Sequence, residues 1–109
     1  LAMQAILEIQ PHPEAVFGMN DMMAIGAMRA IQDAGLRVPE DIAVIGYDDM
    51  RFAAFTNPAL TTVRSPEITQ GRIAAEMVLR LVEGKPIDDL PIMLSTELIV
   101  RASCGSLRS

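Results

Sequence analysis

Short apolar runs alternate with helix-like segments along the first half of the chain. The apolar residues of 1–9 fall on one helical face, so they predict the tail of a helix. Residues 15–19 and 42–47 are apolar runs that turn signals bound, which is typical of buried strands. Residues 22–34 predict a helix that is apolar over most of its circumference. Such a helix is covered on more than one side.

The second half continues this pattern with shorter elements. The sequence predicts, in order, a loop or short helix over 50–55, a strand over 60–64, a helix over 66–82 with Pro66 at its first position, strands over 92–94 and 98–100, and a polar tail over 101–109 that is expected to fray. This order predicts an α/β protein whose strand–helix–strand core is a parallel sheet.

Composition limits the classes of protein to which the chain can belong. Its 109 residues suffice for one small domain, and because half of them are apolar we do not expect disorder. The apolar stretches are shorter than a membrane span, so no membrane partner is expected. The single cysteine fits a reducing cytosol, and a net charge of −5 disfavours direct binding to nucleic-acid phosphates. Because Leu1 lies inside the first predicted helix, we expect the chain to be part of a longer protein.

Two polar pairs follow two successive predicted strands. Asn20-Asp21 comes after the first strand, and Asp48-Asp49 comes after the second. All four residues suit helix caps and turns, which is the commonest role of Asn and Asp after a strand. The carboxyl ends of parallel strands also line the crevice where open α/β sheets bind ligands, and two such pairs favour a ligand site. A carboxylate accepts two hydroxyl hydrogen bonds, while an amide donates and accepts, so a sugar or nucleoside would fit.

Other chemistries find little support in the sequence. The acidic pair could hold Mg²⁺, as in a phosphate-accepting receiver domain, but such a site usually has a nearby lysine, and Lys85, the one lysine, lies in a predicted turn. His12 is the one histidine and Cys104 the one cysteine, so neither a metal cluster nor a histidine-activated nucleophile is expected. No glycine-rich phosphate loop is present. We therefore expect neither catalysis nor a cofactor.

Apolar residues of two segments predict a subunit contact. Phe52 and Phe55 flank a pair of alanines in a segment that is expected to be exposed. Together with Ile25, Met28 and Arg29 of the preceding helix they would form a self-complementary patch, since aromatic residues and Met are enriched at interfaces. Ordinary core packing is the alternative for these side chains.

Several segments together resemble the lactose/galactose repressor (LacI/GalR) family. They match the family in order and spacing: FGMNDMMAIGAMRA at 17–30, GLRVPEDI at 35–42, GYDD at 46–49, PALTTV at 58–63 and ELIVR at 97–101. The resemblance implies the carboxyl-terminal part of the effector-binding, dimerising region of a bacterial transcriptional regulator. Its implied fold is periplasmic-binding-protein-like, with two doubly wound, flavodoxin-like subdomains that enclose a ligand cleft.

The resemblance also assigns residues and partners. Residues 1–64 and 90–103 would belong to the carboxyl-terminal subdomain, and the helix over 66–84 to the other one. Asn20 and Asp48 would contact a small-molecule effector, with Glu67 at a third ligand-lining position. The resemblance further implies a homodimer, and operator DNA would be bound only through an absent amino-terminal domain. A sugar-binding protein of a periplasmic ABC-type uptake system is the alternative with the same fold.

Overall fold

The computed structural model describes residues 2–106, so the predictions for Leu1 and for 107–109 lie outside the described residues. The elements are helix α1 (Ala2–Leu7), strand β1 (Ala15–Phe17), helix α2 (Asp21–Asp33), strand β2 (Ala43–Tyr47), 3-10 helix η1 (Arg51–Phe55), strand β3 (Thr61–Arg64), helix α3 (Glu67–Val82), strand β4 (Glu97–Ile99) and 3-10 helix η2 (Ala102–Cys104). The chain divides into two compact units, of which the second is Ser65–Thr96 and the first is the remainder.

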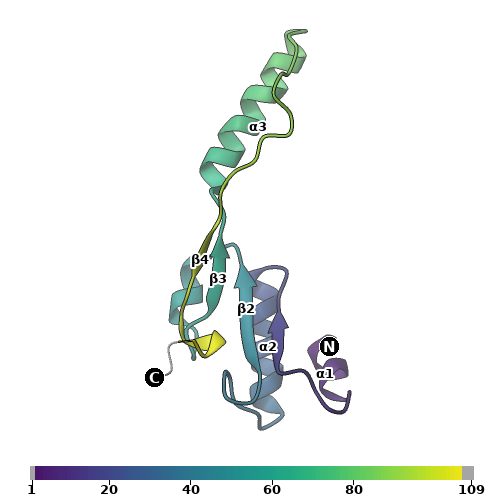
Figure 1. Ribbon diagram of the computed structural model, residues 1–109, viewed down its shortest axis with the longest axis vertical. Helices are drawn as coiled ribbons and strands as arrows, with labels where there is room; N and C mark the ends of the chain where they lie inside the picture. The colour runs from purple at the N-terminus through teal and green to yellow at the C-terminus, as the bar shows by residue number, and fades with distance from the viewer. Residues whose placement is uncertain (1, 107–109) are drawn as a thin grey trace. The chain divides into compact units, whose positions relative to one another are not determined.

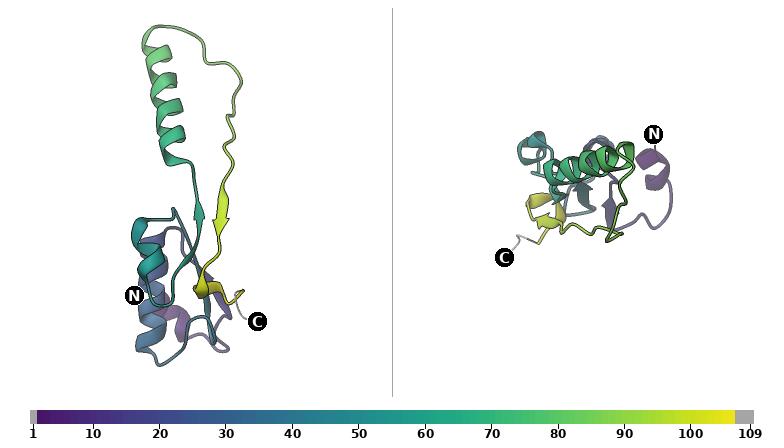
Figure 2. Two further views of the ribbon diagram at one scale, coloured as in Figure 1. Left: turned by 90° about the vertical axis from the view of Figure 1, so that its left-hand side faces the viewer. Right: turned by 90° about the horizontal axis from the view of Figure 1, so that it is seen from above.

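The first unit is built on a four-stranded sheet in the order β1-β2-β3-β4 (Figure 1). β1 pairs with β2 in parallel, with Val16 opposite Val44, and β2 pairs with β3 in parallel, with Gly46 opposite Thr62. β4 runs antiparallel to β3, as Figure 2 shows. The predicted α/β fold with a parallel core is therefore confirmed, and an antiparallel edge strand makes the whole sheet mixed.

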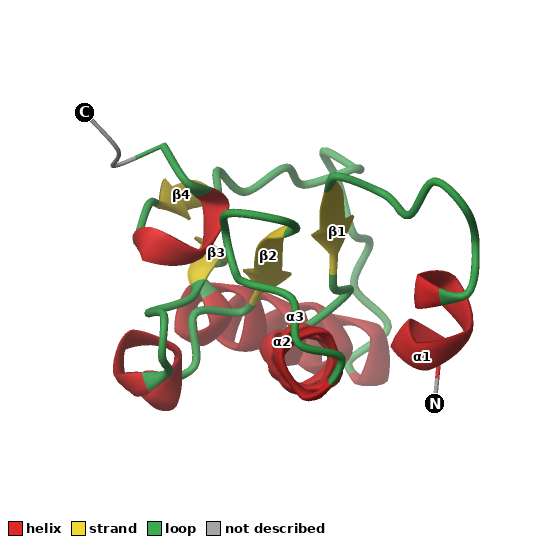
Figure 3. Ribbon diagram, turned by 90° about the horizontal axis from the view of Figure 1, so that it is seen from below, coloured by secondary structure: helices red, strands yellow, loops and turns green. Residues whose placement is uncertain are grey.

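Helices α1 and α2 cover the same face of this sheet (Figure 3). α2 packs on β2 and also contacts α1, which confirms that this apolar helix is covered on more than one side. Ile31, Ile42, Val44 and Leu60 are fully buried in the core that results. Each contributes about 1.5–3 kcal/mol by burial. This core therefore stabilises the strands whose carboxyl ends carry the polar turns.

Two predictions for the end of the chain are wrong. Residues 92–94 form no strand, and among the described residues they have no neighbouring strand with which to pair. The segment 101–106 is not frayed, because η2 returns to the sheet and Ser103 is fully buried. The backbone N–H of Ser103 donates to Ala59 O at 3.0 Å. The polar composition of this segment therefore reflects hydrogen bonding to the sheet.

The second unit consists of α3 and the irregular segment that follows it. α3 ends before Gly84, whose φ of 70° is left-handed as expected for a helix stop. No residue of α3 is buried. Its half-buried Ile73 and Met77 line a hollow of about 330 Å³ together with Ile87 and Ile92 of the following segment. Within residues 2–106, no helix is long and apolar enough to cross a bilayer.

Replacing Gly18, before α2, or Gly26, inside α2, by alanine should change the free energy of unfolding in opposite directions. A Cβ on Gly18 would lie 2.6 Å from the backbone nitrogen of Ala24, whereas a Cβ on Gly26 would meet nothing within 4 Å. Gly18→Ala should lower the free energy of unfolding by about 1–3 kcal/mol, because backbone atoms must shift. Gly26→Ala should raise it by about 0.5–1 kcal/mol, because Gly is a poor helix former. Urea denaturation measures both, and equal effects would contradict the predicted close packing at Gly18.

Candidate functional site

The candidate site lies at the carboxyl ends of β1 and β2, where the sequence predicts a ligand crevice. Asn20 precedes α2 and caps it, since its Oδ1 accepts a hydrogen bond from Met23 N at 2.8 Å. The capping prediction for this residue is confirmed. Its side-chain amide group has no hydrogen-bond partner among residues 2–106, so it remains available as a donor.

Asp21 is fully buried, although the sequence predicts either a helix cap or a crevice-facing group at this pair. Its Oδ1 accepts from the Thr62 hydroxyl at 2.5 Å, and its Oδ2 accepts from Met50 N at 2.7 Å. The carboxylate thereby joins the turn before α2 to the turn after β2. No sequence pattern indicates this role, because Thr62 lies 41 positions away.

The turn after β2 has an unusual backbone. Asp48 and Asp49 have φ values of 109° and 53°, a left-handed region that residues other than Gly rarely adopt. Such conformations persist only where surrounding contacts impose them, and they occur often at ligand sites. Asp48 is half-buried, and its carboxylate has no hydrogen-bond or ion-pair partner among the described residues. It is therefore a free acceptor at the end of a parallel strand.

The Asp49 carboxylate, by contrast, forms ion pairs with two guanidinium groups. Its carboxylate lies 2.7 Å from Arg101 and 2.7 Å from Arg64, and its side chain is only 8% exposed. Burial alone would raise the pKa of Asp49, but the hydrogen bonds from Arg101 and Arg64 outweigh it and hold the pKa below its usual value. Asp49 thus remains ionised and structural. The predicted capping role is wrong for the second pair. The residue at the N-cap position of η1 is Met50, and its side chain forms no capping hydrogen bond.

The arrangement presents a carboxylate acceptor and an amide donor that have no partner among residues 2–106. Asp48 can accept two hydroxyl hydrogen bonds, and the amide of Asn20 can donate to a hydroxyl or ring oxygen. The hydrogen bond between Met50 and Asp21 links the turns that carry them. Among the described residues, no group of three or more His, Cys, Asp or Glu side chains could hold a metal ion.

Glu67, the third residue predicted to line the ligand site, is the first residue of α3 and is exposed. It belongs to the second unit, whereas Asn20 and Asp48 belong to the first. Its role in binding therefore stays a prediction.

One of the five residues predicted to form the dimer interface is buried in the core. Met28 is only 3% exposed and packs in the core, because its spacing from Ala24 and Ile31 places it on the buried stripe of α2. Its assignment to the patch is wrong. The other four residues are at least partly exposed, and the term dimer patch is used below for Ile25, Arg29, Phe52 and Phe55. Ile25 is half-buried, and Arg29 forms an ion pair with Asp33. Phe52 is 40% exposed and Phe55 86% exposed.

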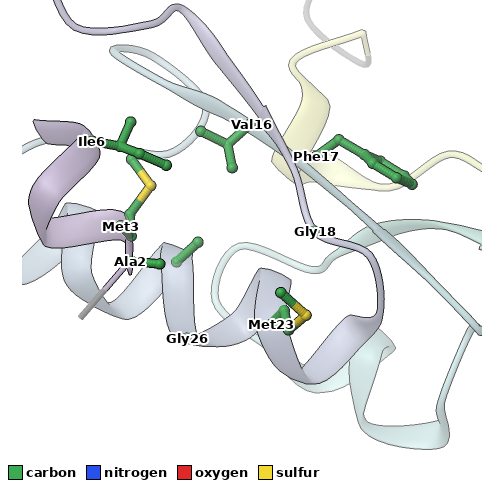
Figure 4. Close-up of a pocket in the computed structure, with 9 residues that line it drawn as sticks. Ala2, Met3, Ile6, Val16, Phe17, Gly18, Met23 and Gly26 are labelled. Atoms are coloured by element: carbon green, nitrogen blue, oxygen red, sulfur yellow. The ribbon is translucent and has the colours of Figure 1, made fainter. Parts of the chain in front are cut away.

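A separate apolar hollow of about 310 Å³ lies between α1, β1 and α2 (Figure 4). Met3 and Ile6 of α1, Val16 of β1 and Met23 of α2 are among the residues that line it. Within the part of the chain that the structure describes, no charged side chain lines it, and neither Asn20 nor Asp48 does. The hollow therefore offers little to a hydroxyl-rich ligand.

Comparison with known proteins defines the class of this fold. The family model of the periplasmic binding protein-like domain matches residues 1–104, and the chain belongs to this family. Within that class, its relatives are transcriptional regulators of the LacI type. The resemblance to the LacI/GalR family is thereby confirmed.

Several regulators illustrate this similarity. The chain is 37% identical over 107 residues to the HTH-type transcriptional repressor PurR of Vibrio atlanticus, covering 98% of this chain and 32% of that protein. It is 37% identical over 102 residues to the HTH-type transcriptional regulator CelR of Thermobifida fusca, covering 94% of this chain and 30% of that one. The chain thus spans about a third of the length of the curated relatives it matches.

Solved structures show the same relationship. A complex of the transcriptional regulator CelR with cellobiose superposes with a TM-score of 0.84 at 37% identity, covering 94% of this chain and 31% of the other. The lac repressor dimer bound to operator and the anti-inducer ONPF gives 0.82 at 34% identity, with the same coverage of 94% and 31%.

Proposed function

We propose that the chain is the effector-sensing and dimerising part of a bacterial LacI-type transcriptional regulator. The observation that carries this proposal is half-buried Asp48, which is held in a left-handed turn and whose carboxylate has no partner among the described residues. It lies at the carboxyl end of a parallel strand, where α/β sheets bind ligands. The relatives named above as HTH-type regulators support the regulatory role.

The proposed effector is a neutral polyhydroxy molecule such as a sugar or a nucleoside. Asp48 accepts two of its hydroxyl groups, and the amide of Asn20 donates to another oxygen. The cellobiose bound in the CelR structure is a molecule of this kind. We assign α3 to the second subdomain of the complete protein, where Glu67 would face the same ligand. An acidic side chain there suits additional hydroxyl groups or a cationic group.

The regulatory role has consequences for the other partners. Because the chain carries a net charge of −5, operator DNA is bound by another part of the protein. The dimer patch joins two copies, and the lac repressor structure named above is likewise a dimer bound to operator. The protein acts in the cytoplasm, where its operator is, and it is not an enzyme. The alternative of a periplasmic uptake protein has no comparable support among the relatives named above.

Replacing Asp48 tests this function directly. In the full-length protein, Asp48→Ala should weaken effector binding by about 2 kcal/mol or more, roughly thirtyfold, because a charge-assisted hydrogen bond is lost. Titration calorimetry against a panel of sugars and nucleosides that includes cellobiose measures the change. Asp33→Ala removes the same charge from an exposed position of α2 and should leave the affinity unchanged. An unaltered affinity in Asp48→Ala would contradict the proposed role.

A further inference from the structure

Each backbone N–H group of the turn over 48–50 has an acceptor outside the turn. The first donates to Val63 O of β3 at 2.9 Å. The second donates to the hydroxyl of Thr62 at 3.2 Å, and the third to Oδ2 of Asp21 at 2.7 Å. The Thr62 hydroxyl in turn donates to Oδ1 of Asp21. Asp21 therefore supports two of the three hydrogen bonds, one directly and one through Thr62.

The surroundings of Asp21 make this support strong. Its side chain is fully buried, and among residues 2–106 it forms no ion pair. The two donors, Met50 N and the Thr62 hydroxyl, therefore supply the hydrogen bonds that offset the cost of burying this carboxylate. Hydrogen bonds to a buried carboxylate are shorter and stronger than neutral ones, in line with the observed distances of 2.5 and 2.7 Å. The carboxylate occupies the space beside Gly46, where a Cβ would collide with its Oδ1.

We propose that Asp21 is a positioning residue for effector binding, acting on Asp48 through the turn over 48–50. By holding Met50 N and the Thr62 hydroxyl, it stabilises the left-handed conformation that presents the Asp48 carboxylate to the proposed effector. Asp21 does not itself contact the effector, because its side chain has no exposed surface. The inference rests on the proposed function only in taking Asp48 as the effector contact.

The chemistry of the site predicts an order of variants. Asp21→Ala removes both acceptors, so Met50 N loses its partner and the Thr62 hydroxyl is free to rotate. Asp21→Asn keeps the size of the side chain and one acceptor oxygen, so it should retain part of the effect. Thr62→Val removes the hydroxyl that joins Asp21 to Asp49 N, with little change of shape. The expected order of disruption is Asp21→Ala first, then Asp21→Asn and Thr62→Val.

Hydrogen exchange tests the positioning role without any ligand. In the full-length protein, mass spectrometry compares peptides that cover 48–50 with peptides that cover Ile31 in the core. Asp21→Ala should accelerate exchange in the turn at least tenfold more than in the core, and Asp88→Ala, at an exposed position of the second unit, should change neither. If Asp21→Ala does not fold, Asp21→Asn and Thr62→Val serve in its place. Equal acceleration in turn and core would show that Asp21 only adds global stability, and would overturn the proposal.

A double-mutant cycle with cellobiose as the probe connects the turn to binding. Asp21→Ala should weaken cellobiose binding at least tenfold when Asp48 is present, and less than threefold in an Asp48→Ala background, where no carboxylate is left to position. An undiminished effect in that background would overturn the inference, while the proposed function would stand. If Asp48→Ala alone leaves cellobiose affinity unchanged, the proposed function fails, and the exchange comparison decides the role of Asp21 by itself.

Discussion

Replacing Ser103 by alanine should lower the free energy of unfolding by about 2–4 kcal/mol, although a single oxygen atom is removed. The Ser103 side chain is fully buried and bridges two strands. Its Oγ donates to Val44 O of β2 at 2.6 Å and accepts from Thr61 N of β3 at 2.8 Å. Alanine would leave both backbone groups buried without a partner, at about 1–3 kcal/mol each.

Urea denaturation of the 109-residue chain measures this loss. Ser95→Ala is the matched control, because Ser95 is exposed in the second unit and its replacement should change stability by less than about 0.5 kcal/mol. If the two variants unfold at the same urea concentration, the Ser103 hydroxyl does not bridge the strands. The same bridge predicts that removing residues 101–109 costs at least as much as Ser103→Ala, because the contacts of Arg101 are lost as well.

Introducing a charge at Phe55 should strongly weaken dimer formation through the dimer patch. Phe55 is 86% exposed, so burial against a second copy would contribute roughly 1.5–3 kcal/mol per side chain. A two-fold interface contains every residue twice, so Phe55→Glu should weaken association by about 3–6 kcal/mol, on the order of 10²–10⁴ in the dissociation constant. Sedimentation equilibrium on the wild-type chain and the variant gives both constants.

Met93→Glu provides the control for this experiment, since Met93 is an 84% exposed apolar residue of the second unit, outside the dimer patch. It should leave the dissociation constant unchanged. The proposed interface would be refuted by a wild-type chain that stays monomeric at high micromolar concentration, or by a Phe55→Glu chain that dimerises as tightly as the wild type.

Much of the fold was predictable because its signals are local. The cap at Asn20, the left-handed Gly35 after α2 and the β-branched run of β2 each act within a few residues. The same helical periodicity could also have predicted the burial of Met28. Met28 follows Ala24 by four positions and precedes Ile31 by three, so it lies on the buried stripe of α2. For this residue the spacing is a better guide than the enrichment of Met at interfaces.

The sequence by itself determined the α/β order of elements, the parallel core strands and the position of Asp48 at the end of β2. These follow from hydrophobic periodicity, capping and turn chemistry, which operate between near neighbours. Only the tertiary structure decided that Asp49 binds Arg101, that Asp21 is buried against Thr62 and that Ser103 bridges two strands. The partners in these contacts lie 52, 41 and, for Val44, 59 positions apart. Polar side chains have many possible partners, and folding selects one only when distant segments meet. For this reason Asp48, whose carboxylate has no partner in the described chain, could be identified as free only after its neighbours were placed.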